Sequence, residues 1–368
     1  MCIRDSMKII KTLIVMLSSV SLFASANAGE LGVSGTAKAT YNILSGKTNV
    51  SKGLGITNEL NFTASGELDN GYTWNYSMEL DPGATQVSGD TDTEGSQSAQ
   101  NDDTKLTVTT PMGTVGVFIS EGGLDVEDAA SQSVYARPTD SGDPSATSDN
   151  YTIDSYNNIQ YHTPADMLPF GITAKIAYAT GLDAYGSGNN AGVVISDADQ
   201  GMGDSATEYQ LKATPLDGLT VGASYMEFSG SGTANTVQDP ESGAYYATYA
   251  TGPFSIGYSK AYKAPIVGNL TAASTVETVD YYDQTNISVA YAATEDLSIS
   301  YEREQSEANY VLNTTADVEQ ESTGVQVAYS MGGATLAISH NTHDNVGYSD
   351  GANPVSYTHL TLPTIVSV

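Results

Sequence analysis

Apolar and polar residues alternate along most of this chain with the two-residue period that is typical of β-strands buried on one face. In the first such segment, Leu31 and Val33 lie on one face, and Ser34 and Thr36 lie on the other. About fifteen segments of roughly 8–12 residues show this alternation. No segment has helical periodicity or an apolar run long enough to cross a bilayer as a helix. The pattern therefore predicts an all-β protein.

The segments are joined by connections that alternate between short and long. The short ones are 69–71, 111–113, 165–170, 216–218, 252–253, 294–296 and 332–333. The long ones are rich in Asp, Ser, Gly and Asn and run roughly 43–53, 82–103, 121–156, 182–205, 230–242, 264–279 and 305–317. Tight turns on one side and long polar loops on the other are typical of a transmembrane antiparallel up-and-down β-barrel. A soluble β-sandwich is the alternative, but it needs a denser aliphatic core than these Gly-, Thr- and Ser-rich faces supply.

Tyrosines on the apolar faces support the barrel. They lie near segment ends, at Tyr41, Tyr72, Tyr178, Tyr209, Tyr225, Tyr258, Tyr291, Tyr301 and Tyr329. Aromatic residues at such positions form the interfacial girdles of membrane barrels. In lipid only a closed sheet pairs every backbone group, so the strands are expected to form a ring.

The N-terminal region has the parts of a secretory signal peptide. A positive start at Lys8 and Lys11 precedes a short apolar run, and Ala26 and Ala28 form an A-x-A cleavage site. We therefore expect residues 7–28 to be removed in the mature protein.

Residues 1–6 and 355–368 differ abruptly in composition from the rest and resemble translated sequencing-adapter read-through. We expect the barrel itself to occupy residues 29–354. The one cysteine, Cys2, lies in the first of these segments. The mature chain then has no cysteine, which excludes a disulfide framework and a cysteine-based metal site.

The chain contains far more acidic than basic residues. The 368 residues include 43 Asp and Glu against 13 Lys and Arg, a formal net charge of −30. Residues 29–368 retain 42 of these acidic and 10 of these basic residues. This composition excludes a nucleic-acid binder, which needs a basic surface to displace counterions. No Ser/His/Asp arrangement stands out, so the sequence predicts no enzyme.

A sharper motif lies near the middle of the chain. The stretch from Tyr156 to Pro164, YNNIQYHTP, is followed by Gly171 and a further strand, and it resembles the strand after the constriction loop of Gram-negative general porins. The hairpin 106–119 is similar to the porin hairpin that leads into that loop. The loop itself departs from the family's Pro-Glu-Phe-x-Gly motif.

The resemblance implies a trimer of sixteen-stranded barrels in the outer membrane of a Gram-negative bacterium. It also implies that the third long loop, about 121–156, folds into the pore. Because only about fifteen strand segments are visible before residue 355, we expect the last strand to be missing from this chain.

The predicted site is an electrostatic filter, since charges facing one another across a constriction set selectivity in such pores. The loop acids are Glu121, Asp125, Glu127 and Asp128. On the polar faces of the strands, the candidate wall residues are Lys38, Lys105, Lys175, Lys212, Glu59 and Glu79. The alternative is that the loop acids are solvated on an external loop.

The second long loop is also acidic. It carries Asp90, Asp92, Glu94, Asp102 and Asp103, which could bind Ca²⁺ weakly together with loop carbonyls. No D-x-D-x-D-G pattern supports a dedicated site, so the sequence predicts no metal and no cofactor.

These observations predict a water-filled, cation-preferring porin for passive diffusion of small hydrophilic solutes, with outer-membrane lipids and lipopolysaccharide around it. One alternative is a substrate-specific channel, for example for sugars. Such a channel would need a row of aromatic residues along the lumen, but the two-residue alternation places only Phe118, Met226 and Phe228 on the lumen side. Another alternative is a non-conducting structural or adhesin barrel.

Overall fold

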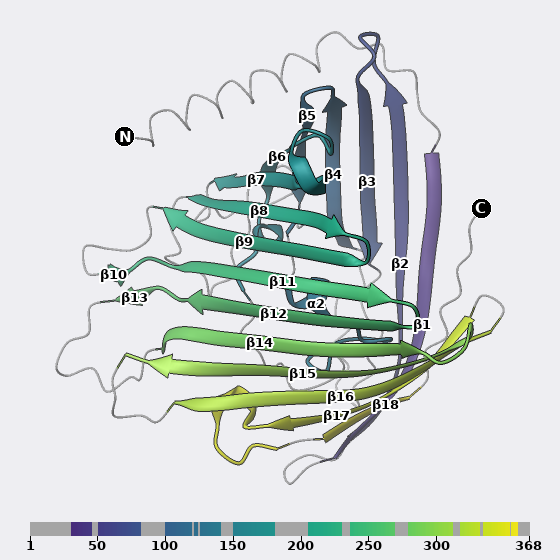
Figure 1. Ribbon diagram of the computed structural model, residues 1–368, viewed down its shortest axis with the longest axis vertical. Helices are drawn as coiled ribbons and strands as arrows, with labels where there is room; N and C mark the ends of the chain where they lie inside the picture. The colour runs from purple at the N-terminus through teal and green to yellow at the C-terminus, as the bar shows by residue number, and fades with distance from the viewer. Residues whose placement is uncertain are drawn as a thin grey trace, which may run out of the picture.

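A computed structural model describes residues 31–45, 51–81, 100–119, 121–123, 126–140, 150–180, 205–229, 236–268, 279–311, 317–331, 334–353 and 355–359. Within these residues, sixteen antiparallel strands form a closed ring in which each strand pairs with its neighbours along the chain (Figure 1). The strands are β1 (Leu31–Ser45), β2 (Ser51–Glu67), β3 (Thr73–Asp81), β4 (Gln100–Thr110), β5 (Gly113–Ile119), β6 (Asn158–His162), β7 (Thr173–Thr180), β8 (Ser205–Leu216), β9 (Leu219–Ser229), β11 (Glu241–Thr251), β12 (Phe254–Ala264), β14 (Val279–Ala292), β15 (Leu297–Tyr310), β16 (Val318–Met331), β17 (Ala334–Asp344) and β18 (Val355–His359). The predicted all-β up-and-down barrel is confirmed.

The remaining elements are short. They are helix α2 (Val126–Ala130), the 3₁₀ turns η1 (Ile153–Ser155), η2 (Pro169–Gly171) and η4 (Val346–Tyr348), and a small ladder of β10 (Thr236–Gln238) with β13 (Val267–Gly268). Among the described residues, no helix has the length and apolar character needed to cross a bilayer.

Burial is inverted relative to a soluble protein. The buried polar positions include Gln160, Gln326 and Asn341, whereas Ile299, Val325 and many other large apolar side chains are exposed on the outside. Most of the predicted girdle tyrosines belong to this exposed set: Tyr209, Tyr225, Tyr258, Tyr291, Tyr301 and Tyr329. An apolar outer surface around a polar interior is the arrangement expected of a barrel in lipid.

Strand registers show which face of the sheet each side chain lies on. Lys38 pairs with Thr57, and Thr36 pairs with Glu59, so these side chains share the inner face of β1 and β2. Continuing from strand to strand, the registers place all six predicted wall residues on the inner face. The two-residue period thus predicted the orientation of these side chains correctly.

The short turns follow local backbone chemistry. In the β2–β3 turn, Gly71 has a φ of +78°, which glycine adopts without steric cost. The Leu68 N–H donates to the Tyr72 carbonyl at 2.7 Å, which closes the hairpin. The Tyr72 N–H also donates to the Asn70 side chain at 3.0 Å.

The sixteenth position of the ring is occupied by residues that we expected to lie outside the barrel. We expected the barrel to end at residue 354 without its last strand, and in the structure the short strand β18 pairs with β17 on one side and with β1 on the other. Its contact with β1 covers only the last five residues, Tyr41–Ser45. Backbone groups at an open sheet edge can pair with almost any extended segment, and this one is rich in β-branched and aromatic residues. A short strand therefore occupies the closing position whatever the origin of its sequence.

Candidate functional site

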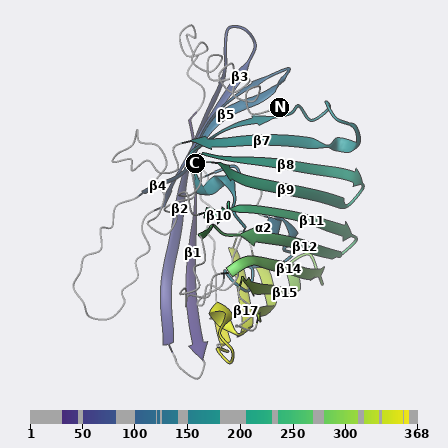
Figure 2. The ribbon, with the colours of Figure 1, turned by 90° about the vertical axis from the view of Figure 1, so that its left-hand side faces the viewer.

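Residues 121–156 are here called loop 3, and the parts of it that the structure describes, 121–123, 126–140 and 150–156, lie on the inside of the barrel. The loop leaves β5, and α2 packs against β9, β11, β12 and β14. Figures 1 and 2 both show α2 against β11 and β12. Residues 131–139 then contact inner side chains of β14, β15 and β16, and residues 151–156 return to β8 and β9. Loop 3 therefore covers the inner wall from β9 to β16.

Two inward amides of β6 join the start of loop 3 to its end. The Asn158 amide nitrogen donates to the Glu121 carbonyl at 3.1 Å and to the Ile153 and Tyr156 carbonyls at 3.2 and 2.9 Å. The Gln160 amide donates to the Gly122 carbonyl at 3.2 Å. Both side chains are buried, with 4% and 0% exposure. These contacts give a physical reason for polar residues at alternate positions of the YNNIQYHTP stretch.

A glycine on the wall makes room for α2. Gly257 on β12 faces inward, and a Cβ built on it would overlap the Ala130 carbonyl oxygen. On β14, the Ser288 hydroxyl donates to the same carbonyl at 3.0 Å and accepts from the Gln132 N–H at 2.8 Å. The helix therefore lies in direct backbone contact with the wall.

Glu302 on β15 holds the segment after α2. Its carboxylate accepts from the Ser131 and Ser133 hydroxyls at 2.6 and 2.5 Å. A third hydrogen bond comes from the Asn286 amide at 2.6 Å. The side chain is fully buried, so three donors compensate for the desolvation of one carboxylate.

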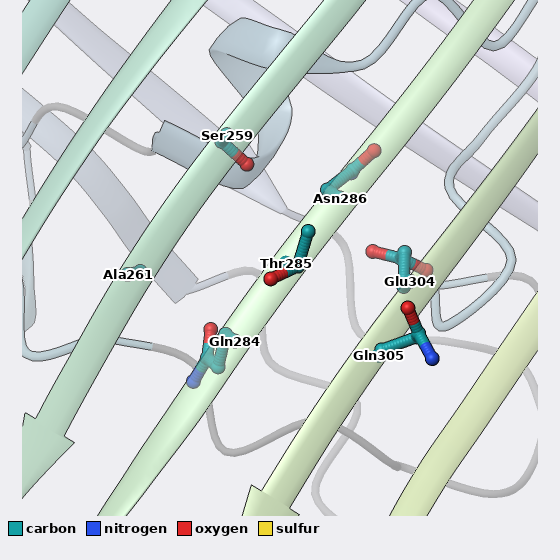
Figure 3. A pocket seen from close by; sticks show the side chains of 7 residues that line it. All are labelled: Ser259, Ala261, Gln284, Thr285, Asn286, Glu304 and Gln305. Atoms are coloured by element: carbon teal, nitrogen blue, oxygen red, sulfur yellow. The ribbon is translucent and has the colours of Figure 1, made fainter.

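Glu304 holds the next part of the loop from the same strand face. It accepts from the Thr139 N–H at 3.1 Å and from its hydroxyl at 2.9 Å. The Arg137 Nη1 lies 3.5 Å from the other carboxylate oxygen. Figure 3 shows Glu304 beside Asn286, at the edge of a small polar hollow in the inner wall.

Arg137 is the centre of a charged cluster within loop 3. Its Nε lies 2.7 Å from Asp128 and 2.9 Å from Asp140. Burial acts to lower the pKa of Arg137, but the hydrogen bond to Asp140 and the charges of Glu304 and Asp128 raise it above its ordinary value. The guanidinium therefore stays charged, and it ties the loop to the wall.

The middle of loop 3 also contacts the first strand of the barrel. The side-chain Oε1 of Gln326 on β16 accepts from the Tyr135 N–H at 3.0 Å. The Lys38 ammonium lies 4.3 Å from the centre of the Tyr135 ring, within cation–π range. Lys38 thus faces loop 3 directly.

The inner wall from β1 to β8 carries a second group of charges. Lys105 Nζ lies 2.5 and 2.8 Å from the two Glu121 carboxylate oxygens. Lys175 lies within electrostatic range of Glu208, Lys212, Lys105 and Glu121. Glu59 and Lys212 are exposed, in contrast to the buried residues under loop 3. This side of the interior therefore presents accessible charges of both signs.

The loop acids predicted from the sequence do not form one free cluster. Glu121 pairs with Lys105 and Asp128 with Arg137. Asp125 and the Glu127 side chain lie outside the described residues, as do most of the predicted Ca²⁺ candidates. Among the residues that are described, no group of three or more His, Cys, Asp or Glu side chains is placed to hold a metal ion.

Sequence reasoning missed the residues that hold loop 3. These are Glu302, Glu304, Arg137 and Gln326. Glu302 and Glu304 are two residues apart on the polar face of β15, so the two-residue alternation alone would have predicted that both side chains point into the barrel. A lone arginine in an acidic loop was a further signal, because such a group needs carboxylate partners when it is buried.

The fold and the infolded loop can be compared with known proteins. The family model described as Gram-negative porin matches residues 12–347, nearly the whole chain. The chain belongs to the Gram-negative porin family. Porins of this family are outer-membrane channels for solute diffusion, so the protein is a channel of the Gram-negative outer membrane.

Solved porin structures share the fold at low sequence identity. OmpF of Salmonella typhi, in complex with daunomycin, is 13% identical with a TM-score of 0.63, and the match covers 91% of this chain and 98% of that one. OmpT of Vibrio cholerae, an outer-membrane protein, is 12% identical with a TM-score of 0.61 over 92% and 98% of the two chains. A mutant of the Rh. blastica porin is 12% identical with a TM-score of 0.55 over 92% and 100%. No curated protein matches the chain.

The contact between Gly257 and α2 leads to a first prediction for this porin. Gly257→Ala should push α2 away from the wall and into the lumen, because the new methyl group would overlap the Ala130 carbonyl. Single-channel conductance should fall by roughly a third, as expected when a pore is narrowed at one side. Ser255→Ala, two residues earlier on the same face, is the matched control. Equal conductance of the two variants would contradict the packing of α2 described here.

Proposed function

We propose that this porin forms a water-filled channel through which small hydrophilic solutes diffuse passively, with its narrowest point beside loop 3. The observation that carries this proposal is the asymmetric course of loop 3. It buries the inner wall of β11–β16, where Ser259, Ser288 and Glu302 are almost completely covered, while charged side chains of β1–β8 remain accessible. A solute would then pass through the space bounded by loop 3 and by the wall of β1–β8, with Lys38, Lys105 and Glu59 at its edge.

We also propose that the channel prefers cations. The mature chain has 42 acidic and 10 basic residues, and a mouth lined by one sign of charge concentrates the opposite ion. At the constriction itself, Glu121 and Asp128 are paired with basic partners. The preference would therefore come largely from the more distant acidic excess and would be sensitive to salt.

A trimer in contact with outer-membrane lipids and lipopolysaccharide is the proposed assembly. The support is membership of the porin family together with the exposed apolar belt on the outside of the barrel. Neither a cofactor nor a catalytic step is part of the proposal.

Liposome swelling with sugars of graded size tests the proposal. Passive diffusion predicts that swelling rates fall smoothly with solute size and do not saturate with concentration. A substrate-specific channel would instead show one sugar entering far faster than others of equal size. A non-conducting barrel would show no swelling, although it folds and inserts.

A further inference from the structure

A second loop also turns onto the inner wall. Residues 345–353, here called loop 8, connect β17 to β18, and η4 within it packs against β16. The Gly347 N–H donates to the Gln320 side-chain oxygen at 2.8 Å. Gln320 is an inward residue of β16 with 0% exposure. Loop 8 therefore covers part of the interior at the end of the barrel that carries the long loops.

Internal hydrogen bonds fix the shape of loop 8. The Asn345 N–H donates to the Asn353 side chain at 3.1 Å, and the Asn345 side-chain oxygen accepts from the Gly351 N–H at 3.0 Å. The Val346 N–H donates to the Ala352 carbonyl at 2.9 Å. These bonds close the loop on itself, so that it presents its tip in one defined orientation.

Tyr348 at this tip points to the wall. Its hydroxyl lies 2.8 Å from the Ser306 hydroxyl on β15, and its ring lies 5.2 Å from the Tyr282 ring on β14. The backbone of Tyr348 has a φ of +55°, which a bulky side chain rarely adopts. Such a conformation persists where surrounding contacts impose it, and these positions concentrate at functional sites. Tyr282 lies on the inner face of β14, and it is an aromatic residue of the lumen that the alternation in the sequence did not indicate.

Loops 3 and 8 occupy successive positions on the same wall. Gln284, Ser306 and Gln320 are register partners on β14, β15 and β16, and loop 8 lies over this row. The adjacent row contains Asn286 and Glu304, where loop 3 is held. Figure 3 shows Gln284, Asn286 and Glu304 around the polar hollow at this boundary.

We propose that loop 8 is a second constriction, in which Tyr348, held by Ser306 and Tyr282, limits the size of solutes before they reach loop 3. This inference rests on the proposed channel function. Because Tyr348 is neutral and its hydroxyl is engaged, it acts by occupying space. It should therefore affect solute size and conductance, and leave the choice between cations and anions to the charged groups.

Tyr348→Ala, Tyr348→Phe and Ser306→Ala test this role in planar bilayers and in liposome swelling. Tyr348→Ala should raise single-channel conductance about 1.5-fold and the swelling rate with a trisaccharide about threefold, as expected when a pore wall recedes. The reversal potential should not change. Tyr348→Phe and Ser306→Ala each remove the hydroxyl–hydroxyl bond but keep the ring, so they should increase open-channel current noise. The matched control is Tyr281→Ala, which removes an exposed tyrosine from the outer face of β14.

The outcomes separate the two claims. A wild type that carries no current refutes the channel function, and the role of loop 8 with it. A conducting wild type with unchanged conductance, noise and swelling in all three variants overturns the role of loop 8 alone. If Tyr348→Ala does not insert into the membrane, the current noise of Tyr348→Phe and Ser306→Ala tests the proposal: increased noise supports it, and noise equal to that of the wild type overturns it. A shift of reversal potential without a change in the size limit would also contradict the proposal.

Discussion

Replacing Glu302 and Glu304 together by alanine should release loop 3 from the wall and raise single-channel conductance about twofold. Glu302 accepts three hydrogen bonds, and Glu304 accepts two and faces Arg137. Hydrogen bonds to a charged group contribute about 1.5–3 kcal/mol each. The stabilisation lost with these hydrogen bonds should exceed the stabilisation that the remaining contacts of residues 131–139 provide. The loop should then become mobile, and current fluctuations should increase.

Glu307→Ala is the matched control for this variant. Glu307 lies on the same strand but on its outer face, directly opposite Glu319. It should leave conductance unchanged. If the double variant keeps both the conductance and the quiet current of the wild type, the two glutamates do not hold loop 3 in place.

Glu121→Gln should lower the preference for cations by roughly two- to threefold in permeability ratio, because one wall lysine loses its counter-charge. In the wild type Glu121 contacts Lys105 at 2.5 Å. Lys175 on β7 lies within electrostatic range of that pair, and Lys212 on β8 lies within electrostatic range of Lys175. The amide would leave the Lys105 ammonium without the carboxylate that neutralises it in the wild type, near a second wall lysine, Lys175.

Reversal potential under a KCl gradient measures this effect. Glu307→Gln, which removes one acidic charge from the outer face, controls for the change in net charge. An identical reversal potential for Glu121→Gln and the wild type would show that ions do not pass beside the Lys105–Glu121 pair.

The strands could be predicted because one physical constraint acts along the whole barrel. Lipid on one side and water on the other require alternation at every residue, so Ile299 and Tyr301 point out while Ser300 and Glu302 point in. Local sequence alone carries this information. The orientation of the wall lysines follows from the same rule.

The contacts of loop 3 could not be predicted in the same way. Ser131 and Glu302, which share a hydrogen bond, are separated by 171 residues. In the sequence, Glu302 and Glu59 are equivalent, since both are inward acids on polar strand faces. The course of the loop alone decides that Glu302 is buried beneath it and that Glu59 stays exposed. The pairing of β18 could not be predicted for a different reason, because backbone pairing depends only weakly on side-chain identity.

The reversal potential of the wild-type porin in a planar bilayer tests the central claim most directly. A KCl gradient should give a cation-selective potential at low salt. This preference should weaken as ionic strength rises, because the Debye length falls from about 10 Å at 0.1 M to about 3 Å at 1 M. An anion-selective potential, or a folded and inserted protein that carries no current, would contradict the account of a cation-preferring diffusion channel.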